Sequence, residues 1–251
     1  MDETKKNNQE PRWGQESRDR KALFILQTLK FFLKEQGNEY GKWLDIGCGS
    51  GGIANTLSDH IGDMVGIDPE PWGRWEQFKK SKAQLNFHVG GYQDIQIKLG
   101  DRAFDVVLCN QVYEHVDNVD ALLGSIYKAL KNDGVCYFAG PNLLWPIEPH
   151  VFWPFVHWFP RSFAHGVMRF LGSKEWESLD ASSWTYWRLK RHFKKAGFDV
   201  KNIIPERIEA ALLTNGKHKV IPLVRFFYGV IRFLTPVTPG FVFLLKKQKN
   251  D

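Results

Sequence analysis

A glycine-rich turn near residue 47 carries the strongest chemical signal in this sequence. Gly47, Gly49 and Gly52 form a G-x-G-x-x-G pattern between a short apolar run and a helical segment. Glycines at such a turn let a ligand approach the backbone, and the N-terminus of the following helix offers unpaired N–H groups. The pattern also marks dinucleotide sites, so by itself it predicts only a nucleotide-type ligand.

Two carboxylates narrow the class of ligand. Asp45 stands two residues before the first glycine, where its charge would repel a pyrophosphate and attract an ammonium group. Asp68 ends the next predicted strand, where it can accept hydrogen bonds from a ribose diol. We therefore expect a nucleoside that carries an amino acid and no phosphate. The alternative is that both carboxylates only stabilise turns or cap helices.

Alternating strands and helices are needed to hold these residues. Short apolar segments followed by helical patterns predict a doubly wound α/β sheet, because parallel neighbours need crossover helices. A helix over residues 17–36 precedes the first strand, and a basic helix over 187–196 comes late in the chain. The predicted strands cover 42–46, 63–67, 85–89, 104–109, 134–139, the AGFDVKNII segment at 196–204, and 240–245.

Four motifs in order resemble the class I S-adenosylmethionine-dependent methyltransferases. They are WLDIGCGSGG, VGIDPE, FDVVLCNQVYEHV and LKNDGVCYFAGPN. The resemblance covers roughly residues 40–140 and the AGFDV strand, and it is to the small-molecule branch that includes the quinone-biosynthesis enzymes. It implies a seven-stranded, mostly parallel, Rossmann-like sheet in the order 3-2-1-4-5-7-6 with an antiparallel seventh strand. S-adenosylmethionine would be the cofactor and S-adenosylhomocysteine the product.

The resemblance also implies where the cofactor would lie. The methionine end would contact Asp45 and the glycine turn, and Asp68 would hold the ribose. The family often has an acidic residue near the adenine amino group where this chain has Gly91, so Asp94, or Tyr92 with Gln93, is the expected substitute. The Cys48 thiol is expected to fill apolar space, since no basic partner is identifiable nearby. The implied cofactor-binding residues are Asp45, Gly47, Cys48, Gly49, Gly51, Asp68, Pro69, Asp94, Asn110 and Gln111.

Two histidines are the predicted catalytic residues. Methyl transfer from a sulfonium is a direct displacement, so orientation supplies much of the acceleration, and a base helps if the acceptor is a hydroxyl. His115 follows the fourth strand and His150 begins the segment after the fifth. Each has a structural alternative: His115 would position the cofactor loop, and His150 would pack within a lid. Glu114 suggests a metal, but no further acidic partner stands at a matching position, so we expect none.

The composition is that of a folded globular protein, and we expect a single domain over residues 1–250. Of 251 residues, 43% are apolar and 25% charged, which excludes collagen-like, disordered and coiled-coil chains. The three cysteines form no C-x-x-C pair and the polar first 20 residues lack the apolar stretch of a secretory signal, so we expect a cytoplasmic protein. The parts are the helix 17–36, a cofactor-binding core 40–140, an aromatic insert 141–186 and a basic C-terminal part 187–251.

Aromatic and basic residues are concentrated late in the chain. Residues 141–190 hold 12 of the 36 aromatic residues, and residues 188–251 hold 14 Lys and Arg against 4 Asp and Glu. The insert is expected to be either a lid over the acceptor site or an interfacial patch. The segment VIPLVRFFYGVIRFL predicts a helix with Arg225 and Arg232 on one face, which either lies on an anionic bilayer or packs on the sheet edge. Its arginines, Pro236 and Pro239 argue against a membrane span.

These features favour an O-methyltransferase that acts on a hydrophobic or lipid-linked small-molecule or glycan acceptor. The enzyme would be a peripheral protein at the inner face of the membrane. A soluble small metabolite is the alternative acceptor. Nucleic acid is disfavoured, because aromatic and basic residues are not interleaved in one recognisable module. A non-catalytic binding module also remains open, whereas Asp45 argues against a dehydrogenase.

Overall fold

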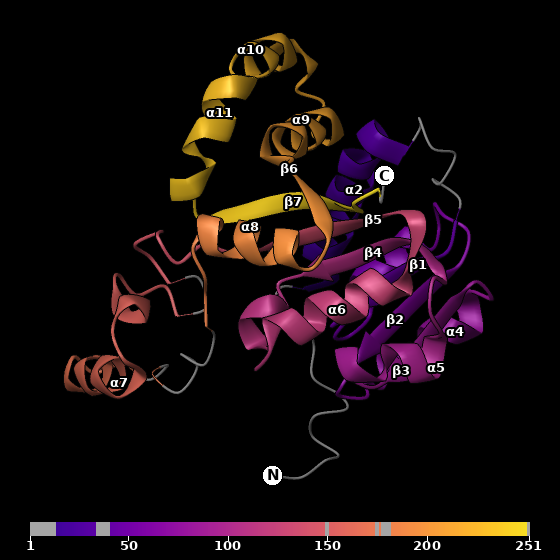
Figure 1. Cartoon of the computed structure of the whole chain (residues 1–251), viewed down its shortest axis with the longest axis horizontal. Coiled ribbons are helices and arrows are strands. Elements are labelled where there is room, and N and C mark those ends of the chain that lie inside the picture. Colours follow the sequence, from indigo (N-terminus) through magenta and orange to yellow (C-terminus); the bar gives the residue numbers. More distant parts are fainter. Residues whose placement is uncertain (1–13, 34–40, 149–150, 174–175, 177–181, 250–251) are drawn as a thin grey trace.

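The computed structural model describes residues 14–33, 41–148, 151–173, 176 and 182–249. Its centre is a seven-stranded sheet in the order β3-β2-β1-β4-β5-β7-β6 (Figure 1). All neighbouring strands are parallel except that β7 runs antiparallel to both β5 and β6. The strands are β1 (Trp43–Ile46), β2 (Met64–Asp68), β3 (Leu85–Val89), β4 (Phe104–Asn110), β5 (Leu130–Pro141), β6 (Phe198–Asn202) and β7 (Gly240–Lys247).

The predicted strand order and the antiparallel last strand are confirmed. The strand bounds agree within one or two residues, except that β5 begins at Leu130 instead of residue 134. The helix α6 (Val119–Ala129) leads directly into this strand, and the pairing of β5 with β4 shifts in register between Phe104–Leu130 and Val106–Val135. The N-terminal helix α2 covers Gly14–Leu33 and begins three residues before the predicted 17–36, of which residues 34–36 lie outside the described ranges.

Helices cover both faces of the sheet because alternate residues of each strand point to opposite sides. On one face, α2 and α3 (Gly52–Leu57) pack over Trp43 of β1 and Val106 of β4. On the other, α6 and α8 (Tyr186–Lys195) pack over Leu44 and Val107 of the same strands. The connections also contain two short helices that the apolar periodicity did not predict, α4 (Arg74–Ser81) and α5 (Ile95–Leu99).

The aromatic insert leaves the sheet at the carboxyl end of β5 and returns to the same side, where the parallel strands end. Asn142 Nδ2 donates to the carbonyls of Pro236 and Thr238 at 2.8 and 3.0 Å. At the other end of the insert, the Ser182 N–H donates to the Glu114 carbonyl at 2.7 Å, directly after β4. Between these ends, α7 (Arg161–Phe170) lies away from the sheet (Figure 1) over a small apolar cluster of its own, made of Val151, Val156, Ala164 and Met168.

The prediction of one continuous amphipathic helix before β7 is wrong. The chain forms α10 (Ile221–Phe226) and α11 (Tyr228–Leu234), separated at Phe227. Phe227 has φ −90° and ψ 9°, which does not continue an α-helix. The stretches His218–Phe226 and Tyr228–Val237 bend by 69°. Within the described ranges, no single helix has the length and apolarity to cross a membrane, and these two meet that criterion only as a bent pair.

The two arginines of this segment do not form an open basic face. They pair with glutamates of α9 (Ile204–Thr214), Arg225 with Glu209 and Arg232 with Glu206. The sequence pattern placed both arginines on one side, and from that side they reach the acids of α9. Both side chains stay partly exposed, Arg225 at 62% and Arg232 at 39%, so contact with an anionic bilayer stays a prediction.

Candidate functional site

The glycine turn between β1 and α3 depends on backbone conformations that favour glycine. Gly47, Gly49 and Gly51 all have positive φ, at +65°, +52° and +78°. Space is also limiting at Gly51, because a Cβ atom there would lie 2.6 Å from Cζ of Phe87. The Gly47 N–H donates to the Ile67 carbonyl at 2.8 Å, so the turn is fastened to the end of β2.

Asp68, at the carboxyl end of β2, holds this turn in place. Its Oδ2 accepts a hydrogen bond from the Gly49 N–H at 2.8 Å, and its Oδ1 accepts from the Glu70 N–H at 3.0 Å. Each carboxylate oxygen can accept two hydrogen bonds. Asp68 therefore has acceptor capacity left for a neighbouring pair of hydroxyl groups. Burial raises the pKa of this carboxyl group above its ordinary value.

Asp45, in β1, is the most perturbed acid of the site. Its side chain is only 4% exposed. Burial, together with the nearby charge of Asp68, raises the pKa of Asp45 to about 7, although Lys21 and Arg18 act in the opposite direction. A buried carboxyl group with this pKa is half ionised near neutrality, so a bound cation would shift it to the ionised form.

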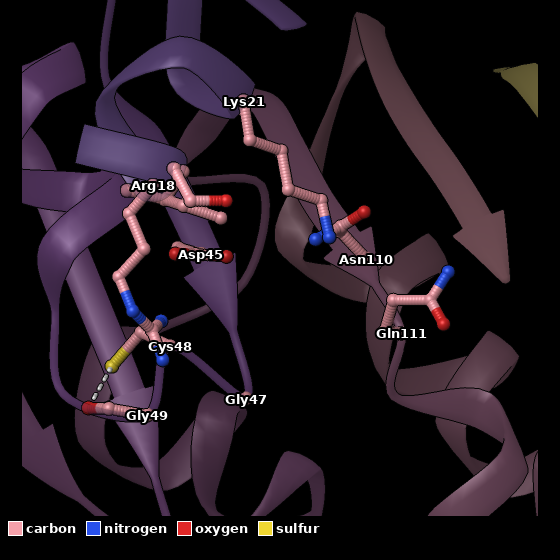
Figure 2. A pocket seen from close by; sticks show the side chains of 10 residues that line it. Arg18, Lys21, Asp45, Gly47, Cys48, Gly49, Asn110 and Gln111 are labelled. Carbon is pink, nitrogen blue, oxygen red and sulfur yellow. Dashed lines mark hydrogen bonds between the residues drawn. The ribbon is translucent and has the colours of Figure 1, made fainter. Parts of the chain in front are cut away.

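Two cations from α2 lie opposite Asp45, and they were not among the predicted site residues. Figure 2 shows Arg18 and Lys21 reaching from the helix toward the glycine turn and Asn110. Burial lowers the pKa of both groups, and in each case a neighbouring arginine adds to the effect. Their spacing of three residues puts them on one helix face. That spacing was visible in the sequence, but the position of the helix over the turn was not.

These groups line a cavity of about 540 Å³, which is within the size range of small-molecule sites. Of the predicted residues, the structure brings six into this cavity, from β1, the glycine turn and the end of β4 (Figure 2). Its full lining is Ser17, Arg18, Lys21, Asp45, Gly47, Cys48, Gly49, Ile53, Asn110 and Gln111.

A second, smaller cavity of about 200 Å³ lies on the other side of Gly47. Pro69 and His115 also line it, as do Tyr92 and Gln93, the pair expected near the adenine. Gly51, Asp68 and Asp94 line neither cavity. Asp94 instead accepts a hydrogen bond from the Gly91 N–H at 2.9 Å, and so stabilises the turn after β3. The lining is Ile46, Gly47, Ile67, Pro69, Gly90, Gly91, Tyr92, Gln93, Val112, His115, Val116 and Asp117.

Three further observations concern reactivity. Cys48 is buried, and burial raises the pKa of its thiol well above the ordinary value, so the thiol stays protonated at neutral pH. Gln111 has a φ of +60°, a strained conformation for a non-glycine residue at the wall of a cavity. Among the described residues, no three His, Cys, Asp or Glu side chains form a group that could hold a metal ion. His150 lies outside the described residues.

Comparison with known proteins identifies a family. A family model described as "Methyltransferase domain" matches residues 16–202. The ubiquinone biosynthesis O-methyltransferase of Pelagibacter ubique is 31% identical over 121 residues, which are 47% of this chain and 49% of that protein. The enzyme of the same name from Hydrogenovibrio crunogenus is 27% identical over 136 residues, or 52% and 56%. The chain thus spans about half the length of the curated relatives it matches.

Solved structures share the fold at low sequence identity. The plantazolicin methyltransferase BamL, solved with a desmethyl substrate analogue and S-adenosylhomocysteine, superposes with a TM-score of 0.60 at 16% identity, over 93% of this chain and 86% of that one. The 1,6-didemethyltoxoflavin-N1-methyltransferase of Burkholderia thailandensis gives 0.54 at 15% identity, over 93% and 79%. Because this family model covers most of its length, the chain belongs to the methyltransferase domain family.

Proposed function

We propose that this enzyme methylates an oxygen atom of a hydrophobic or lipid-linked small-molecule or glycan acceptor at the inner face of the membrane. The observation that carries the proposal is the aromatic insert. Hydrogen bonds of Asn142 and Ser182 hold its two ends at the side of the sheet where the parallel strands end and the glycine turn lies. Six of its aromatic side chains are exposed: Phe152, Phe155, Trp158, Phe159, Phe163 and Phe170. Such a surface suits an apolar acceptor.

The two cavities fit the two ends of S-adenosylmethionine. The larger one offers a carboxylate and two cations, which match the ammonium and carboxylate groups of the methionine end. Asp45 would hold the ammonium group, and Arg18 with Lys21 the carboxylate. Asp68 lies beside the glycine turn, where it would accept hydrogen bonds from the ribose. The smaller cavity, with the apolar side chains of Ile67 and other residues, suits the adenine ring.

In this arrangement the side chains around the larger cavity would position the cofactor and the acceptor for the reaction. When bound, S-adenosylmethionine supplies the methyl group as an electrophilic sulfonium. The strained Gln111 and its neighbour Asn110 close the larger cavity at the end of β4, where they would orient the reacting groups. Water exclusion by the insert would favour direct displacement, and the acceptor hydroxyl must lose its proton as the new bond forms.

The position of His115 favours a contact with the cofactor over proton abstraction. It lines the smaller cavity with Tyr92 and Gln93, across Gly47 from the cavity that contains Asp45. We therefore propose that His115 contacts the adenine side of the cofactor. His150, which stands at the start of the insert in the sequence, remains the predicted base for the acceptor hydroxyl.

The role of α2 can be tested by removing one of its charges. Arg18→Gln is expected to raise KM for S-adenosylmethionine at least about tenfold with little change in kcat, since hydrogen bonds to a charged group contribute roughly 1.5–3 kcal/mol. Arg20→Gln is the matched control, because Arg20 is on the same helix but pairs with the exposed Glu16. Steady-state kinetics on both variants give the answer. An unchanged KM in Arg18→Gln would assign the carboxylate to another group.

The acceptor class can be tested by transfer of an isotope-labelled methyl group into a host lysate. Organic, aqueous and acid-precipitable fractions are counted separately. Label is expected in the organic fraction, and its transfer should be lost with Asp68→Ala. Label only in the aqueous fraction would make the acceptor a soluble metabolite and the insert a closed lid. Label only in the acid-precipitable fraction would show a macromolecular acceptor and overturn the proposal.

A further inference from the structure

A second apolar surface, separate from the insert, lies on the outside of α10 and α11. Its two largest side chains, Phe226 and Phe233, are 82% and 81% exposed, which is unusual for phenylalanines of a folded protein. Single exposed apolar residues need no explanation, but a contiguous set suggests a partner. We call this set the hairpin face: Leu223, Phe226, Val230, Phe233, Leu234 and Val237, all exposed.

Acids of α9 neutralise the two arginines of the hairpin, although the Arg225 side chain stays 62% exposed. Arg225 donates to Glu209 through Nη2 at 2.5 Å and Nε at 3.0 Å, and the Tyr228 hydroxyl donates to the same carboxylate. Arg232 Nη2 donates to Glu206 at 2.5 Å. Although burial opposes ionisation of Glu209, these hydrogen bonds hold its pKa below the ordinary value. The pairs hold the bent hairpin against α9 with its apolar side outward.

The two residues of fixed charge just before α10 in the sequence are both lysines. Lys217 and Lys219, both exposed, immediately precede α10. The sequence has no Asp or Glu between Glu209 and Asp251. Exposed apolar side chains preceded by two exposed lysines complement a surface of acyl chains beneath anionic headgroups. A second copy of this chain would instead bring the lysines of both copies together across a two-fold interface.

The hairpin is connected to the start of the aromatic insert. The end of α11 leads through Pro236 and Thr238 into β7, and both carbonyls accept hydrogen bonds from Asn142 at the start of the insert. In Figure 1, α11 and the insert lie at the same end of the sheet. A flat partner that contacts the hairpin would therefore meet the protein beside the edge where the parallel strands end.

We propose that the hairpin face is a docking surface for a lipid bilayer with anionic headgroups. The 69° bend places α10 and α11 along a surface instead of through it, and their length and apolarity match a membrane only as a bent pair. The phenylalanines enter the acyl boundary while Lys217 and Lys219 contact headgroups. This inference rests on the proposed function in one respect: docking at a bilayer would bring the enzyme to a hydrophobic acceptor.

The test is sedimentation of the full chain with phosphatidylcholine vesicles, with and without phosphatidylglycerol. Binding to the vesicles with phosphatidylglycerol is expected, weakened by added salt. Phe226→Ser with Phe233→Ser should reduce the partition coefficient at least about tenfold. Lys217→Gln with Lys219→Gln should reduce binding to anionic vesicles while leaving the apolar face intact. The matched control is Ile97→Ser, because Ile97 is 87% exposed on α5, outside the hairpin face.

Two further measurements separate the possible outcomes. Calorimetry should give the same affinity for S-adenosylmethionine in the phenylalanine variant as in the unmodified protein. That result would show that the variant folds, so a loss of vesicle binding would concern docking and not the proposed function. Sedimentation velocity reports whether the hairpin face joins two copies. The proposal is overturned if the unmodified protein ignores anionic vesicles, if the phenylalanine variant binds them equally well, or if that substitution merely converts a dimer to a monomer.

Discussion

Replacing Asp45 with asparagine is expected to weaken S-adenosylmethionine binding about a hundredfold and yet to stabilise the ligand-free protein at pH 8. The loss of affinity arises because the ammonium group would lose a charge-assisted hydrogen bond, which contributes roughly 1.5–3 kcal/mol. The gain in stability arises because Asp45 is buried and must be ionised at this pH beside Asp68. Asparagine keeps the shape without that cost.

The stability effect has a defined pH window. The pKa of Asp45 is about 7 in the folded protein, against about 4 for an unperturbed aspartate. Below about pH 4 the group is protonated in both states and contributes nothing. Between pH 4 and 7 the unfolded state ionises first, so stability falls as pH rises, and above pH 7 the loss is complete. Asp45→Asn should therefore raise the melting temperature by several degrees at pH 8 and little at pH 4.5.

Affinity for S-adenosylmethionine should rise with pH, whereas the stability of the ligand-free protein should fall. Asp45 must lose its proton to hold an ammonium group, so affinity should increase as pH rises through 7 and level off until the amino group of the ligand itself deprotonates near pH 8. Calorimetry at pH 6 and pH 7.5 measures this difference, which Asp45→Asn should abolish. Asp63→Asn serves as the control, because Asp63 is exposed just before β2. A flat profile in the unmodified protein would contradict the assignment of Asp45 to the ammonium group.

Replacing Asp68 with alanine is expected to reduce kcat/KM at least about a thousandfold. The substitution removes the proposed acceptor of the ribose hydroxyls, at roughly 1.5–3 kcal/mol for each hydrogen bond to the charged group. It also leaves the Gly49 and Glu70 N–H groups without their acceptor, so the glycine turn loses the contact that positions it. Both effects act on the same ligand and should combine.

The conservative variant separates these two effects. Asp68→Asn keeps one carbonyl oxygen that can accept from Gly49 N–H, but it loses the charge and one acceptor position. It should therefore recover part of the activity if positioning of the turn matters. Kinetics of Asp68→Ala, Asp68→Asn and the control Asp63→Ala make the comparison. Equal activity of Asp68→Ala and the unmodified protein would exclude Asp68 from the cofactor site.

The predictions that the structure confirms concern the sheet and the glycine turn, and they depend on neighbouring residues. Gly47, Asp45 and the strand before them occur within a few positions, so one short segment specifies both the turn and the carboxylate beside it. Asp68 is similar, since it ends a strand that the apolar run at 63–67 already predicts. The order of the sheet followed because four such segments occur in a fixed sequence, which the resemblance translated into an arrangement that the structure confirms.

The remaining features depend on how distant segments pack. Arg18 and Lys21 belong to the site only because α2 crosses above the glycine turn, and no local pattern encodes that crossing. His115 and Asp45 were both predicted as site residues, but they line different cavities, and Gly47 lines both. Helical periodicity shows which residues share a face without showing what that face meets. For Arg225 the partner is Glu209, 16 residues earlier, and this pairing turns the apolar side of the hairpin outward.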